Sequence, residues 1–307
     1  MRTIQMQILL PHSIAIPDGA YEVYAARHVR TIQLLRPTQI VYETDLRQEV
    51  ILCEEQSLVS MDFVTDVDLT EVQNVRNEFS RCANIRKTKS SVSEANTLTT
   101  ANRLIDWYRV QTGRHHIIQL VFSQIEFAQL IDVGSPSRSL RIYHHEETRP
   151  VDEPLSDDEV QTLRQNLIKR QSPPLEEILL LDAEEALSQH RYKECILICW
   201  SAIESIFDPL IRAKLKEKLP DIGFDIGQAG WNIERDLWFF TRLDVLPRLL
   251  TDFSFKELPD DFWNRLQRSR NVRNQVIHEG EDIEEDDSAN TLSVTREFVK
   301  AMEAFRD

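Results

Sequence analysis

The pattern of apolar residues changes near residue 150, and this change indicates two differently built halves. Before it, short runs rich in Val, Ile, Leu and Tyr, which favour β-strands, are bounded by Pro, Gly, Asp or Ser. The runs predicted to form strands are residues 1–13, 29–35, 40–44, 49–53, 116–122 and 139–143. Residues 70–84 and 93–110 have the spacing of helices. Residues 1–150 are therefore expected to form an α+β domain of unknown role, such as a sensor or recruitment module.

The boundary between the halves is predicted from composition. Residues 146–159 combine two prolines with a dense acidic run, and such a composition buries too little apolar surface to hold a fixed fold. The Ser172-Pro173-Pro174 step then ends a short helical segment, because proline removes a backbone donor and restricts the residue before it. We therefore expect an acidic, proline-containing linker with a short helix over residues 151–174.

Residues 175–307 have the spacing of amphipathic helices almost throughout. Residues 175–190 and 192–219 are predicted to form an antiparallel helix pair joined by a tight turn near His190. Further helices are predicted over residues 233–250, 260–278 and 287–305, and the glycine-rich residues 221–232 are predicted to be a loop. The expected fold class is thus an α+β domain followed by an all-α bundle.

Composition restricts the partners and the compartment. The net charge of −15 at pH 7 opposes an extended cationic surface of the kind that wraps nucleic acid, so any contact with RNA is expected to be small and local. No stretch approaches the roughly 18 uninterrupted apolar residues of a membrane span. The four cysteines lack the spacing of a disulfide framework. A cytoplasmic location without membrane contact is the simplest expectation.

One short segment late in a predicted helix has a pattern associated with chemistry. In the sequence SRNVRNQVIHEG, residues 269–280, Arg273 and Asn274 are followed by three residues and then by His278. This pattern resembles the R-x4-6-H signature of HEPN domains, whose commonest form is R-N/D-x-x-x-H. The segment is therefore the main candidate for a functional site in the chain.

The residues upstream of this segment extend the resemblance. Residues 186–207 are similar to the first two helices of the HEPN family, with an A-I-E step that ends at Glu204. The resemblance covers residues 175–307 and implies a HEPN-like helical bundle, whereas residues 1–150 resemble no known family. It implies an endoribonuclease that acts as a homodimer on RNA and needs no metal or other cofactor. Such proteins often act as toxins or in antiviral defence against phage, so an antitoxin or another protein is an expected partner.

The implied reaction is attack of a ribose 2′-hydroxyl on the adjacent phosphate, which requires a proton acceptor, a proton donor and positive charge. By the resemblance, His278 and Arg273 supply these groups, Asn274 orients the histidine or the ribose, and Glu204 is the supporting acidic residue. On an α-helix Asn274 and His278 share one face, whereas Arg273 lies about 140° from His278. One helix cannot aim all three inward, so two helices are expected to face each other across a two-fold axis.

The acidic residues after the motif leave alternatives open. The end of the helix and the carboxylates within residues 279–287 favour a charged imidazole at His278, which suits a general acid. The same carboxylates would repel RNA if they lined the cleft; otherwise they form a solvated loop or a flap over the site. Arg273 and His278 also have a structural interpretation, as a salt-bridging arginine and a helix-capping histidine. The alternative function is a non-catalytic HEPN-like module that binds nucleotide, RNA or a partner protein.

Other polar and aromatic groups are weaker candidates. Cys195 and Cys199 are four residues apart on a predicted helix, but no second ligand pair has suitable spacing, so both are expected to pack in the core. The basic residues 81–89 could contact a phosphate backbone or a nucleotide, although such a short charged run usually forms only a solvated face. The aromatic residues 238–240 are expected to form a core or a dimer contact. No Walker loop, G-x-G-x-x-G, G-x-S-x-G or H-E-x-x-H element occurs, so the enzyme classes that use them lose their usual support.

Overall fold

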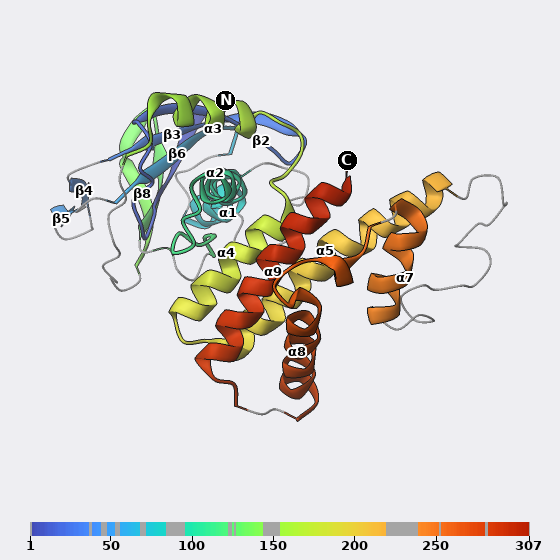
Figure 1. Cartoon of the computed structure of the whole chain (residues 1–307). Coiled ribbons are helices and arrows are strands. Elements are labelled where there is room, and N and C mark those ends of the chain that lie inside the picture. The colour runs from blue at the N-terminus through green and yellow to red at the C-terminus, as the bar shows by residue number, and fades with distance from the viewer. Residues whose placement is uncertain are drawn as a thin grey trace. The chain divides into compact units, whose positions relative to one another are not determined.

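The chain folds into two compact units, Met1–Pro173 and Pro174–Asp307, in a computed structural model (Figure 1). The structure describes residues 2–36, 39–43, 48–52, 56–67, 72–83, 96–121, 125, 127–143, 154–218, 239–251, 253–279 and 282–306. Within these residues, no helix combines the length and the apolar character that crossing a membrane requires.

The first unit is built on an antiparallel sheet with the strand order β2-β3-β6-β1-β7-β8. Its strands are β1 (Arg2–Leu9), β2 (Gly19–Ala25), β3 (His28–Leu35), β6 (Leu58–Thr65), β7 (Phe127–Asp132) and β8 (Ser135–Tyr143). A separate hairpin consists of β4 (Gln39–Glu43) and β5 (Gln48–Leu52). In β1 the side chains of Ile4, Met6 and Ile8 enter the core, because alternate residues of a strand face the same side.

The described helices of the first unit are α1 (Val72–Ala83), α2 (Thr97–Thr112) and α3 (Asp157–Leu167). The α2 helix begins at Asn96, whose side-chain oxygen accepts a hydrogen bond from the Thr99 N–H (2.9 Å). It ends at Gly113, which has the left-handed conformation (φ 68°) that glycine adopts readily. Leu104 and Tyr108 of α2 are buried in the same core as the sheet. The first unit is thus of the expected α+β class.

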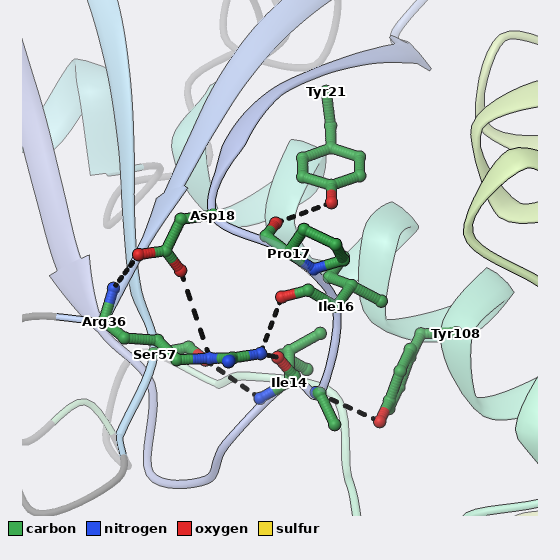
Figure 2. A network of polar contacts seen from close by, with 9 residues as sticks. Ile14, Ile16, Pro17, Asp18, Tyr21, Arg36, Ser57 and Tyr108 are labelled. Atoms are coloured by element: carbon green, nitrogen blue, oxygen red, sulfur yellow. Dashed lines mark hydrogen bonds and ion pairs between the residues drawn. The ribbon is translucent and has the colours of Figure 1, made fainter. Parts of the chain in front are cut away.

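Side chains from several other segments bind the backbone of the loop between β1 and β2 (Figure 2). The guanidinium of Arg36, directly after β3, donates to the carbonyl oxygens of Ile14 and Ile16 (3.1 and 2.6 Å). The Tyr108 hydroxyl of α2 accepts a hydrogen bond from the Ala15 N–H (3.2 Å). Since buried backbone groups need such partners, these bonds fix the loop between the sheet and α2.

The prediction of a strand over residues 116–122 is wrong for the described residues, 116–121, which form turns and irregular backbone. Ile117 and Leu120 are buried in the core, as the apolar pattern requires. However, the backbone N–H and C=O of Leu120 bond to the side chain of Asn102 on α2 (2.7 and 2.9 Å). A side-chain amide therefore takes the place of a neighbouring strand, and β propensity does not reveal this.

Residues 154–173 of the predicted linker belong to the first unit. The short helix expected there is α3, which begins with a capping box: the Ser156 hydroxyl accepts from the Glu159 N–H (3.4 Å), and the Glu159 carboxylate accepts from the Ser156 N–H (2.8 Å). Leu163 of α3 is fully buried in the core of this unit. The helix thus packs against the core of the first unit through one apolar face, despite its acidic composition. Residues 151–153 lie outside the described part of the chain.

The second unit is mostly helical, as expected. Its described elements are α4 (Leu175–Ser188), α5 (Tyr192–Lys218), α7 (Phe239–Thr251), the 3-10 helix η4 (Phe255–Glu257), α8 (Phe262–Asn274), the π-helical turn η5 (Gln275–Glu279) and α9 (Glu285–Arg306). A tight turn at His190 (φ 57°) joins α4 to α5. The main core lies among α5, α7, α8 and α9, where the rings of Phe207, Phe255 and Phe298 contact one another.

The helices predicted for this half correspond, in chain order, to α4, α5, α7, α8 with η5, and α9. The loop predicted over residues 221–232 lies outside the described residues, as do the first residues of the helix predicted over 233–250. The end of that helix is α7.

Candidate functional site

The predicted motif begins on α8, which is fixed against α5. The indole N–H of Trp200 on α5 donates to the Ser269 carbonyl oxygen on α8 (3.3 Å). Trp200 is buried, and so are Leu266 and Val272 on the core side of α8. A buried indole N–H usually has a hydrogen-bond partner, so this bond helps to set where α8 lies along α5.

Arg273 lies where α8 meets Glu204 of α5. Its Nη2 is 3.9 Å from Oε1 of Glu204, and its Nη1 donates a hydrogen bond of 3.4 Å to Oδ1 of Asn274. The side chains of Arg273 and Glu204 are 30% and 49% exposed. An ion pair of this length and exposure is weak, so an incoming anion can compete for the guanidinium. Three of the four predicted site residues are thus brought together.

The backbone changes geometry immediately after Asn274. Residues Gln275–Glu279 form the π-helical turn η5 instead of continuing the α-helix. A π-helical hydrogen bond joins residues five apart, and such turns occur frequently at functional sites. The predicted angle of about 140° between Arg273 and His278 assumes α-helical geometry and is corrected here. The wider turn brings residues five apart closer to one face of the helix.

His278 lies on η5 with its side chain exposed. It makes no hydrogen bond or ion pair with the residues that the structure describes, Arg273 and Glu204 included. The structural interpretation of His278 as a helix-capping residue therefore has no hydrogen bond to support it. The imidazole is accessible to a ligand or to a second chain.

Part of the acidic run after the motif begins the next helix. Residues 285–287 lie in the first turn of α9, where carboxylates stabilise the positive end of the helix dipole. Asp282 lies 3.0 Å from the ammonium of Lys193, and Glu285 accepts a hydrogen bond from the Tyr192 hydroxyl (3.1 Å). These carboxylates thus have contacts within the second unit.

Two further arginines lie beside the motif, and the sequence interpretation missed both. Arg270 is one helical turn before Arg273, and its guanidinium lies over the rings of Phe239 and Phe240 on α7, 4.7 and 5.3 Å from their centroids. Burial lowers the pKa of Arg270, and the charges of Arg273 and Arg242 lower this pKa further. The spacing of residues 270 and 273 is visible in the sequence, but the position of α7 against α8 is not.

Arg242 of α7 is almost fully buried. Its Nη1 donates a hydrogen bond of 2.8 Å to Oδ1 of Asp208 on α5. Its Nε is also buried and has no hydrogen-bond partner among the residues that the structure describes. Helices α5, α7 and α8 therefore contribute to one group of charged side chains. We call this group the arginine cluster; it consists of Arg242, Arg270, Arg273, Glu204 and Asp208.

The weaker candidates have structural contacts. Cys195 and Cys199 are fully buried, which confirms core packing, and a hydrogen bond between their thiols together with burial raises the pKa of Cys199. In the basic stretch, Arg81 pairs with Glu78 at 2.7 Å, and residues 84–89 lie outside the described part. Within the described residues, no group of three or more His, Cys, Asp or Glu side chains is arranged to hold a metal ion.

Comparison with known proteins gives no match to this chain, whether with protein-family models, with curated proteins or with solved structures. The resemblance to HEPN domains therefore depends on the motif residues and on the helices that carry them. Any function has to be argued from the geometry of Glu204, Arg273, Asn274 and His278 and tested directly.

Proposed function

We propose that the second unit is a HEPN-type endoribonuclease that acts as a homodimer and needs no metal ion. The observation that supports this most directly is that Arg273 and His278 are both accessible to solvent at the end of α8 and are separated by the start of a π-helical turn. Either side chain packed beneath the core would have removed the basis of the proposal. Glu204 and Asn274, which contact the guanidinium, complete the proposed site.

In the proposed reaction, the 2′-oxygen of a ribose bonds to the adjacent phosphorus while the bond from phosphorus to the 5′-oxygen breaks. One proton leaves the 2′-hydroxyl and one is given to the 5′-oxygen, so the products are a 2′,3′-cyclic phosphate and a 5′-hydroxyl. His278 donates or accepts a proton, and Arg273 stabilises the negative charge that develops on the phosphate oxygens. Glu204 and Asn274 position the guanidinium before the phosphate binds.

The dimer is part of the proposal because the motif of one copy contains one histidine, His278, whereas the reaction needs both a proton acceptor and a proton donor. Two copies related by a two-fold axis would place two His278 and two Arg273 side chains around one phosphate. We expect light scattering to give twice the 35.9 kDa mass of a single chain. An active sample with the mass of one chain would contradict the dimer.

RNA cleavage is the direct test. The full chain is incubated with total RNA in EDTA, and we expect fragments with cyclic-phosphate ends. His278→Ala is expected to slow cleavage by about 10²- to 10⁴-fold, the usual contribution of a general acid or base. Arg268→Ala, on an exposed position of the same helix, is the matched control for Arg273→Ala and is expected to cleave normally. Intact RNA with the natural chain, or undiminished cleavage by His278→Ala, would contradict the proposal.

The contact between Glu204 and Arg273 also supports a second candidate function. In this alternative the pair only ties α8 to α5, and the second unit is a non-catalytic module that binds nucleotide, RNA or a partner protein. Glu204→Gln and Arg273→Gln would then lower the free energy of unfolding by a similar amount, about 0.5 kcal/mol for a partly exposed pair. RNA would remain intact with every variant, and binding without turnover would distinguish this module from the nuclease.

For the first unit we propose a sensor or recruitment role. The motivating feature is an open surface pocket of about 390 Å³ with a largely polar lining, whose volume lies in the range of ligand pockets. The lining includes Asn102, Arg103 and Asp106 of α2. The Nε of Arg103 is buried without a hydrogen-bond partner in the described part of the chain.

A further inference from the structure

The cationic members of the arginine cluster outnumber its anionic members. Asp208 accepts a hydrogen bond from Arg242 (2.8 Å), and Glu204 lies 3.9 Å from Arg273. Arg270 is the remaining member, and it makes no hydrogen bond or ion pair with the residues that the structure describes. One guanidinium in the cluster therefore lacks an anionic partner of its own.

The surroundings of Arg270 make this arrangement costly in the free protein. Its side chain is half-buried, so it has lost part of its hydration. Arg273 and Arg242 repel it, and Glu204 attracts it less strongly. The rings of Phe239 and Phe240 hold its guanidinium by cation–π contact. A cation that is partly desolvated, held in place and repelled by like charges gains most when an anion binds beside it.

We propose that Arg270 binds a phosphate of single-stranded RNA next to the phosphate held at Arg273, an inference that rests on the proposed nuclease function. The two arginines are three residues apart on α8, so their Cβ atoms are about 5–6 Å apart on one side of the helix. A guanidinium binds phosphate oxygens through paired N–H groups. Arg242 is close enough for its charge to act on Arg270. Such contacts position an RNA chain without reading its bases.

The length of the substrate follows from this geometry. An RNA with one phosphodiester contacts only Arg273. An RNA with a second phosphodiester, on the side of the first one that faces Arg270, also contacts Arg270. We expect the second phosphodiester to tighten binding by roughly tenfold, the effect of one charge-assisted hydrogen-bonded contact. That gain should be absent from Arg270→Gln and partly restored in Arg270→Lys.

The test measures binding of 2′-O-methylated oligonucleotides, which cannot be cleaved, to the full chain. We expect Arg270→Gln to weaken binding of the longer oligonucleotide about tenfold and to reduce the salt dependence of the binding constant by about 0.7 in log–log slope. Arg268→Gln removes the same charge from an exposed position on the same helix and should leave both quantities unchanged. Circular dichroism checks that each variant is folded.

Failures of the two proposals are distinguishable. A folded Arg270→Gln variant with unchanged affinity, salt slope and KM would overturn the second phosphate site while leaving cleavage by His278 intact. The second phosphate site would also be overturned if the short and the long oligonucleotide bound with equal affinity, or if inorganic phosphate alone bound as tightly as the long oligonucleotide. In the opposite case, Arg270→Gln weakens binding but the natural chain cleaves no RNA. That result would support the proposed phosphate site and contradict the proposed nuclease function. A raised KM with kcat within about twofold is the result expected if both hold.

Discussion

Arg265 of α8 and Glu297 of α9 form a close ion pair, in contrast to the longer contact between Arg273 and Glu204. Two parallel hydrogen bonds join them, one of 2.9 Å, in the geometry that makes arginine–carboxylate pairs stronger. The bond to Arg265 lowers the pKa of Glu297. The folded protein therefore keeps this carboxylate ionised at a lower pH than the unfolded chain does, so the pair stabilises the fold above the unfolded pKa of about 4.3.

Glu297→Gln is expected to lower the free energy of unfolding by about 0.5 kcal/mol at pH 7. The value is small because the Glu297 side chain is 43% exposed and screened by solvent. As the pH falls from the unfolded pKa of about 4.3 through the lower folded pKa, the natural chain loses the same stabilisation, so the difference between the two proteins should shrink over this range. A double-mutant cycle with Arg265→Gln, measured by urea unfolding at pH 7 and pH 3, isolates the pair. An equal loss at both pH values would contradict the assignment.

At the scale of secondary structure, the sequence predicts the helices better than the strands. The helices of the second unit keep one apolar face over many turns, and this periodicity locates α5 and α9 within a few residues. Strand β6 was missed because residues 58–61 are all buried, so the alternation expected of a half-buried strand is absent. Strands β2 and β7 were missed as well.

The candidate site was predictable only in part. The residues of the motif and Glu204 follow from the resemblance, and the structure brings Glu204 to Arg273. The π-helical turn was not predictable, because a change from four-residue to five-residue hydrogen bonding leaves no clear mark in the sequence. The place of Arg270 in the cluster depends on the rings of α7, which lie about thirty residues earlier in the chain.

The cap of α3 provides a test at the scale of one element. Ser156→Ala removes the hydroxyl that accepts the Glu159 N–H, and it should lower the stability of the first unit by about 1 kcal/mol. Ser156→Asn is the matched control, since asparagine caps helices about as well as serine. Thermal or urea unfolding of the full chain measures both variants. Equal losses for the two would show that the hydrogen bond to the cap does not contribute.

For the whole molecule, the two units have separate buried cores, and every residue of the proposed nuclease site lies in the second. Leu163→Ala leaves a cavity in the first core and should cost about 2–5 kcal/mol, and Phe207→Ala in the second core about 3–5 kcal/mol. We expect calorimetry to show that each variant lowers the unfolding temperature of its own unit. RNA cleavage should persist with Leu163→Ala and fall with Phe207→Ala, at temperatures where only the damaged unit unfolds. A single transition that both substitutions lower equally would mean that the units unfold together, and the first unit would then be required for the stability of the site.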